Sequence, residues 1–105
     1  MQDPFFHNNV VECAKRAVLC DITPKLNAVT IQFTKKSLLL RGYFETGATD
    51  DDKEELDHAL TVIAAELWKE IEEFYFEAVT VQNLSEMKCL KEWIYVKPEL
   101  QTNSA

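Results

Sequence analysis

Three cysteines are the residues of this chain whose chemistry would be nucleophilic. A cysteine enzyme needs a thiolate held beside a base. Cys13 and Cys20 lie on the apolar face of an expected helix, a placement typical of small core side chains. Cys89 follows Lys88 in an expected loop, where the favoured interpretation is a surface thiol without a catalytic role. The pattern therefore predicts no cysteine nucleophile.

Metal ligands would have to come from His7, His58 and the carboxylates. Zinc sites usually show close pairs, such as CxxC or two His at i and i+4, and the sequence has neither. A site assembled from Glu54, Asp57 and His58 is the alternative, but acids in the first turns of a helix normally face solvent and the helix dipole. The two glycines are too few to build a phosphate-binding loop. We predict no metal, no cofactor and no enzymatic activity.

The charges of the chain are unevenly placed. Residues 1–48 carry six Lys/Arg against four Asp/Glu, whereas residues 49–105 carry five Lys against fourteen Asp/Glu. The two parts have formal charges of +2 and −9, which make up the −7 of the whole chain. An acidic surface repels phosphate backbones and attracts cationic partners. Direct nucleic-acid binding is therefore not expected, and a basic protein partner is.

Carboxylates gather in two runs, one at 50–55 and one at 70–73. Paired carboxylates act as acid and base only when burial shifts their pKa values, and dense runs usually lie on a solvated surface. Aromatic side chains on expected strands can supply binding hot spots beside such acids, or can equally extend the core. The candidate partner-binding residues are Asp50, Asp51, Asp52, Glu54, Glu55, Glu72, Glu73, Tyr43, Tyr75, Trp93 and Tyr95.

These residues are positioned by elements that the pattern of the chain predicts. A helix is expected to begin at Asp3-Pro4, because Asp is a preferred N-cap and Pro a preferred first residue. Thr23-Pro24 ends it, since the residue before proline disfavours the α region. Alternating apolar and polar residues predict strands over 29–34 and 38–45, joined by a tight turn at Lys35-Lys36.

The second half begins with a strongly amphipathic helix. Thr49 or Asp50 can cap it, and apolar residues then repeat at helical spacing to about Glu72. A third strand is predicted over 74–82, where two alternations compete for the inner face and a bulge could reconcile them. A fourth short strand is predicted over 93–97.

The fold class that follows is α+β, with the order α-β-β-α-β-β. The simplest architecture is a four-stranded antiparallel sheet with two helices packed on one face. One domain is expected over residues 1–98, and residues 99–105 have the composition of a disordered tail.

The expected location is the cytoplasm. No apolar run approaches the roughly 20 residues that a membrane-spanning helix requires. The first residues, 1–4, lack the basic and apolar regions of a signal peptide. An odd number of cysteines without motif spacing suits a reducing compartment.

Five segments of the chain also carry a family resemblance. They are Ile22-Thr23-Pro24, Leu26-Asn27-Ala28-Val29, Leu40-Arg41-Gly42-Tyr43-Phe44-Glu45, Asp50-Asp51-Asp52-Lys53-Glu54-Glu55-Leu56 and Glu92-Trp93-Ile94-Tyr95. Over roughly residues 10–97 the chain resembles small bacterial immunity proteins of contact-dependent growth inhibition and related polymorphic toxin systems. The resemblance implies a cytoplasmic antitoxin that binds and blocks a delivered toxin, often a nuclease. It fixes no contact residues.

The function expected from these observations is that of an immunity protein that neutralises a cationic, nuclease-type toxin domain by occlusion. Complementary charge would speed the association of the two proteins. The expected oligomeric state is a monomer or a weak homodimer. The alternative is a small bacterial adaptor or homodimerising module without a toxin partner. An enzyme that uses Cys89 or the acidic cluster is the least favoured class.

Overall fold

The computed structural model describes residues 4–98, and its α-helices and strands follow the expected order, with an additional 3₁₀ turn between the last two strands. The elements are α1 (Pro4–Leu19), β1 (Leu26–Phe33), β2 (Ser37–Glu45), α2 (Asp50–Leu67), β3 (Glu73–Val81), a 3₁₀ turn η1 (Leu84–Glu86) and β4 (Glu92–Val96). The expected N-cap at Asp3 and the expected tail at 99–105 lie outside the described residues. Within residues 4–98, no helix is long and apolar enough to cross a membrane.

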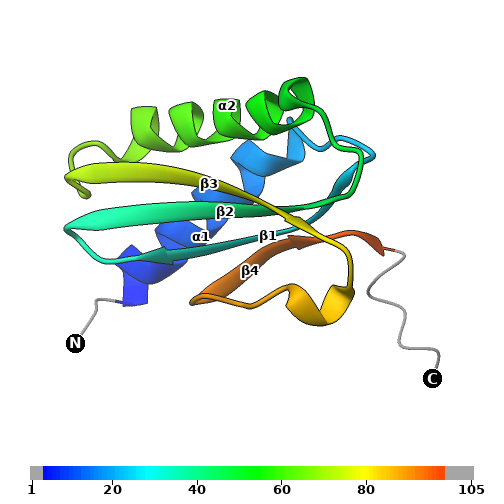
Figure 1. Ribbon diagram of the computed structural model, residues 1–105. Helices are drawn as coiled ribbons and strands as arrows, with labels where there is room; N and C mark the ends of the chain where they lie inside the picture. The colour runs from blue at the N-terminus through cyan, green and yellow to red at the C-terminus, as the bar shows by residue number, and fades with distance from the viewer. Residues whose placement is uncertain (1–3, 99–105) are drawn as a thin grey trace.

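The sheet is mixed, so the prediction of an entirely antiparallel sheet is wrong. Its strand order is β3-β2-β1-β4, and β1 pairs antiparallel with both β2 and β4. β2 and β3, however, run parallel over their whole length. The reason is the connection between them: α2 returns the chain along the sheet to the end at which β2 began (Figure 1). A strand that follows such a return helix must run in the same direction as the strand before it.

Both helices cover the same face of the sheet, as expected (Figure 1). The side chains between the layers form one continuous core, which includes Val10 and Val18 of α1, Leu40 of β2, and Leu56 and Ile63 of α2. All five are fully or almost fully buried. The repeat of apolar residues along each helix therefore points toward the sheet, and the polar residues point to solvent.

α2 ends earlier than the sequence pattern indicates, at Leu67 rather than near Glu72. The backbone N–H groups of Glu70 and Ile71 both donate to the Leu67 carbonyl oxygen, at 2.9 Å each, in a tightened last turn. This turn places the Ile71 side chain in the core. Ile71 thus keeps the apolar spacing of the α2 residues and is buried with them, although it lies after the last residue of the helix.

β3 resolves its two competing alternations without a bulge. Its register with β2 is uninterrupted from Glu73 to Val81. Phe74, Phe76 and Ala78 pack against the main core under the helices, whereas Val79 and Val81 join a second, smaller cluster. The bulge that could have reconciled them is absent from the pairing of β3 with β2, and the irregularities of the sheet lie instead in the pairings of β1 with β2 and β4.

The segment 82–91 crosses the sheet on the face opposite the helices. A crossing is needed because β3 and β4 form opposite edges of the sheet, and the helices already cover the other face (Figure 1). Met87 from this segment packs with Ala28, Tyr43 and Trp93 in the second cluster. The outer face of the sheet is thus partly covered by the chain itself, near β1 and β4.

Gly42 of β2 lies against Leu56 of α2, with no room for a side chain between them. A Cβ atom added there would lie 2.2 Å from Leu56 Cδ2 and 3.1 Å from Phe44 Cε2. Both neighbouring side chains are fully buried, so neither has free space into which to move. The packing of α2 against β2 therefore requires a residue without a side chain at position 42.

We predict that Gly42→Ala destabilises the fold by about 1 to 3 kcal/mol, because the added methyl group overpacks the layer between α2 and β2. Urea denaturation measures this change. The double variant with Leu56→Ala is the control, because removing the clashing side chain should make the two losses less than additive. Strictly additive losses would refute the clash.

Candidate functional site

The acidic first turn of α2 is built by a capping box. The Asp52 backbone N–H donates to Thr49 Oγ1 at 3.2 Å, and the Thr49 backbone N–H donates to Asp52 Oδ2 at 2.9 Å. Asp52 therefore serves the helix end and holds the first turn in place. Thr49, rather than Asp50, is the N-cap.

Four carboxylates remain exposed around this helix end. They are Asp50, Asp51, Glu54 and Glu55, here called the acidic rim. In the part of the chain that the structure describes, none of them forms an ion pair. The partial positive charge of the helix N-terminus stabilises these carboxylates, so the fold tolerates their mutual repulsion. The rim thus offers negative charge that no neighbouring side chain neutralises.

Glu72 and Glu73 lie at the other end of α2. The two ends of this 18-residue helix are separated by roughly 27 Å at 1.5 Å per residue. The backbone N–H groups of Glu72 and Glu73 donate to the carbonyl oxygens of Lys35 and Lys36, at 3.3 and 3.1 Å. These two glutamates therefore stand beside a basic turn, and the candidate acids form two separate surfaces.

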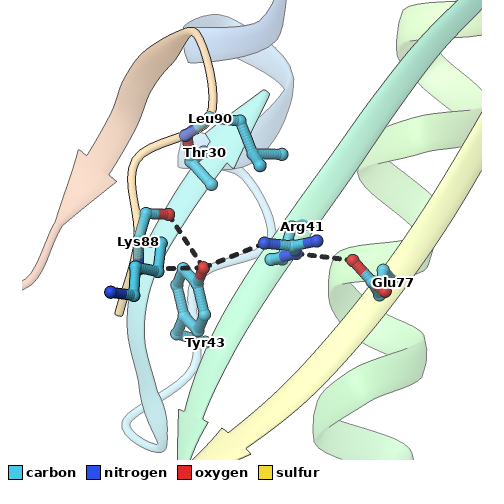
Figure 2. A network of polar contacts seen from close by, with 6 residues as sticks. All are labelled: Thr30, Arg41, Tyr43, Glu77, Lys88 and Leu90. Atoms are coloured by element: carbon cyan, nitrogen blue, oxygen red, sulfur yellow. Dashed lines mark hydrogen bonds and ion pairs between the residues drawn. The ribbon is translucent and has the colours of Figure 1, made fainter. Parts of the chain in front are cut away.

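Tyr43 is buried on the outer face of the sheet, with an exposed fraction of 2%. Its hydroxyl donates to the Lys88 carbonyl oxygen at 2.8 Å and accepts from the Lys88 backbone N–H at 3.0 Å. Arg41 Nη1 donates to the same hydroxyl at 3.2 Å, as Figure 2 shows. This hydrogen bond is the main reason that the pKa of Arg41 is raised. Tyr43 thus fastens the crossing segment to the sheet.

Thr30 provides a second attachment for the crossing segment. Its hydroxyl accepts from the Leu90 backbone N–H at 2.9 Å and donates to the Glu92 carbonyl oxygen at 2.7 Å. Thr30 is fully buried, so a hydroxyl without these partners would lower the stability of the fold. Together, Tyr43 and Thr30 hold the segment 82–91 in one course over the sheet (Figure 2).

The other three candidate aromatics differ in exposure. Trp93 is half-buried against Tyr43, with a ring-centroid distance of 6.2 Å, and Tyr95 is half-buried against the main core. Tyr75 is 50% exposed. Its hydroxyl donates to Glu73 Oε1 at 3.0 Å, and this hydrogen bond raises the pKa of Tyr75. Tyr75 is the candidate aromatic that stands most open to a partner.

Two surface features were not apparent in the sequence pattern. Phe5 is 84% exposed and lines a pocket of about 580 Å³ together with Lys35 and Lys69. Trp68, at the end of α2, is 64% exposed, although its sequence position is beside the apolar stripe. Phe5 directly precedes Phe6, which belongs to the apolar stripe of α1. Neighbouring residues of a helix point in different directions, so the sequence position of Phe5 already indicated that it lies off the buried face.

Cys13 is a buried core thiol, as predicted. Its Sγ–H donates to Glu66 Oε2 at 2.7 Å, and Arg16 Nη2 donates to the same oxygen at 3.2 Å. Burial, assisted by Glu66, raises the pKa of Cys13 to about 12, and the thiol hydrogen bond lowers the pKa of Glu66. Cys20, by contrast, is exposed, so its predicted place in the core is wrong. α1 ends at Leu19, before Cys20 can turn inward.

The alternative metal site at Glu54, Asp57 and His58 is not formed among the described residues, because His58 pairs with Asp21 instead. His58 Nδ1 lies 3.2 Å from Asp21 Oδ2, which joins α2 to the end of α1. His7 Nε2 lies 2.9 Å from Glu92 Oε2. Residues 4–98 contain no group of three or more His, Cys, Asp or Glu side chains arranged to hold a metal ion. Each histidine thus links two elements of the fold.

We predict that Tyr43→Phe destabilises the protein by about 1 to 3 kcal/mol, because the Lys88 backbone groups lose their partner. Thermal or urea unfolding measures the loss, and faster amide exchange at Lys88 locates it. Tyr95→Phe is the matched control and should change stability by less than about 0.5 kcal/mol. Equal effects of the two variants would contradict the role given to the Tyr43 hydroxyl.

We also predict that two of the three thiols react with Ellman's reagent at pH 8 in the folded protein. Cys20 and Cys89 are exposed, whereas Cys13 is buried and stays protonated at this pH. The third thiol should react only after denaturant is added. Cys13→Ala should leave the fast reaction unchanged, and a loss of fast-reacting thiol in that variant would contradict the burial of Cys13.

A model of the MafI2 immunity protein family matches residues 7–99. No curated protein matches the sequence. The match spans nearly all of α1 and every later helix and strand, and it confirms the resemblance to immunity proteins of toxin systems. The chain therefore belongs to the MafI2 immunity protein family.

Proposed function

We propose that the protein is an immunity protein that binds a cationic, nuclease-type toxin domain in the cytoplasm and neutralises it by occlusion. The toxin would belong to a contact-dependent or related polymorphic system. The observation that carries the proposal, beyond the family, is the acidic rim of α2. Its four exposed carboxylates have no ion-pair partner among residues 4–98 and are available to an opposite charge.

The chemistry of nucleases supports this choice of partner. A nuclease domain holds phosphate groups with Lys and Arg side chains, so its substrate-binding surface is cationic. A rigid acidic surface can compete for those side chains without performing catalysis. Long-range attraction also raises the association rate, which matters when a toxin must be captured before it acts. The protein would therefore inhibit by covering the toxin and would need no enzymatic activity.

The competing candidate is a homodimerising adaptor that buries Trp93 and Tyr95 between two copies. Trp93 already packs against Tyr43 within one chain, and Tyr95 packs against the main core. Both rings are therefore already half-buried within one chain. Sedimentation of the purified protein distinguishes the two candidates, because a tight homodimer with these rings protected would favour the adaptor.

The first experiment is a pull-down from the native strain with tagged protein, followed by mass spectrometry at low and moderate salt. Retention of one basic toxin domain supports the proposal. Retrieval of the protein alone, or of a housekeeping complex, would favour the adaptor.

We predict that the double variant Asp51→Lys, Glu55→Lys slows association with that toxin domain about tenfold or more at low salt, because it reverses the rim charge. Stopped-flow or surface plasmon resonance measures the rate. The double variant Glu12→Lys, Glu70→Lys is the matched control, because it makes the same change in net charge on exposed positions away from the rim. Equal slowing by both variants would indicate a net-charge effect and would remove the rim from the proposal.

A further inference from the structure

The two edges of the sheet differ in how well they are protected against a further strand. β4 is five residues long, its register with β1 is broken by an irregularity, and Pro98 follows shortly after it. β3 is nine residues long, contains no proline and pairs with β2 without interruption. Short length, bulges and proline are common means of blocking an edge. Of the two edge strands, β4 has all three of these features and β3 has none.

The backbone of β3 presents unpaired groups along this edge. The Glu73 N–H donates to the Lys36 carbonyl oxygen on the β2 side, at 3.1 Å. Successive residues of a strand direct their N–H and C=O groups to opposite sides, so alternate residues from Phe74 onward face away from β2. Those residues are Phe74, Phe76, Ala78 and Thr80. Their outward groups have no hydrogen-bond partner between residues 4 and 98.

The side chains along β3 determine which strand could pair there. Glu73, Tyr75 and Glu77 alternate on the outer face and are all exposed. If two copies paired antiparallel at this edge about Tyr75, Glu73 of each copy would oppose Glu77 of the other. Like charges that face each other across strands are destabilising. Glu77 is already paired with Arg41, so the Glu73 carboxylate is the one left to disfavour a second copy and to favour a strand that carries Lys or Arg.

The chain itself contains an example of the recognition that this surface would use. The Arg41 guanidinium lies 5.9 Å from the centroid of the Tyr43 ring and pairs with Glu77. Tyr75 and Glu73 form a similar aromatic and carboxylate pair, held together by their hydrogen bond. No cation of the described chain is paired with this second set. It is therefore available to a basic side chain from outside.

We propose that the open edge of β3 receives an extended, basic segment of the toxin, which adds a fifth strand to the sheet. Backbone hydrogen bonds to Phe74, Phe76, Ala78 and Thr80 hold the segment, and one Lys or Arg side chain of it rests on Tyr75 beside Glu73. This inference rests on the proposed function, because the occupant is the toxin domain. It adds a binding mode and a contact surface distinct from the acidic rim.

The test uses the toxin domain retained in the pull-down and measures amide exchange by NMR in the free and bound protein. The amides of Phe74, Phe76, Ala78 and Thr80 should gain protection on binding. The alternate amides, such as Tyr75 and Glu77, are already bonded to β2 and should change little. This two-residue periodicity distinguishes strand addition from simple covering of the surface. Uniform protection along β3, or none, would overturn the proposal.

A variant tests the same edge independently. Ala78→Pro removes one outward N–H without removing a hydrogen bond to β2, and it should weaken toxin binding at least tenfold by calorimetry. Ala78→Ser keeps the N–H and is the control, and circular dichroism checks that both variants fold. Glu73→Lys, which leaves the backbone intact, should also weaken binding. If Ala78→Pro and Glu73→Lys both leave toxin binding unchanged, strand addition at β3 is refuted but the immunity function is not. If the pull-down retains no toxin at all, both proposals are refuted.

Discussion

The return of the chain through α2 is the constraint on which the rest of this structure depends. Because α2 spans the sheet and brings the chain back to the end where β2 began, β3 can only run parallel to β2. β3 takes the edge beside β2, since β1 already occupies the other side of that strand. The chain must then cross the whole sheet to reach β1 from its free side and form β4.

That crossing explains the polar network of the outer face. The segment 82–91 contains one 3₁₀ turn but no α-helix or strand, so most of its backbone groups need partners from the sheet below. Tyr43 supplies one hydroxyl for both backbone groups of Lys88, and Thr30 does the same for Leu90 and Glu92. These two side chains are buried because they hold the segment. The same contacts leave the first part of β3 on the outer face, with Tyr75, uncovered.

The distribution of acids now has a structural interpretation. One acidic surface surrounds the start of α2, where the helix dipole favours negative charge. A second follows β3 along the sheet edge, where Glu73 is exposed beside Tyr75 and Glu77 is paired with Arg41. The net charge of −7 thus combines two surfaces with different geometry, one a cluster at a helix end and the other a row along a strand. Both suit a basic partner in an immunity protein, but they would contact different parts of it.

Much of the fold could be predicted because its signals are local. Helical spacing, strand alternation and the cap at Thr49 act over a few residues, so the order and type of the elements were readable, although α1 ends at Leu19, before the stop expected at Thr23-Pro24. The direction of β3 was not read correctly, because pairing between distant strands leaves no pattern within either strand. Where α2 ends was also misjudged, since Ile71 keeps the apolar spacing and its N–H still bonds to the Leu67 carbonyl oxygen, although the regular helix ends at Leu67.

For the candidate surface, the sequence by itself determined its chemistry: an acidic second half, aromatics on strands and no cysteine or histidine pattern of a catalytic site. Only the tertiary structure decided which of those residues a partner can reach. Tyr43 and Tyr75 have the same side chain and both lie on outer strand positions, yet one is 2% and the other 50% exposed. The physical reason is that burial depends on what passes over a residue, and the segment that covers Tyr43 comes from 45 positions further along the chain.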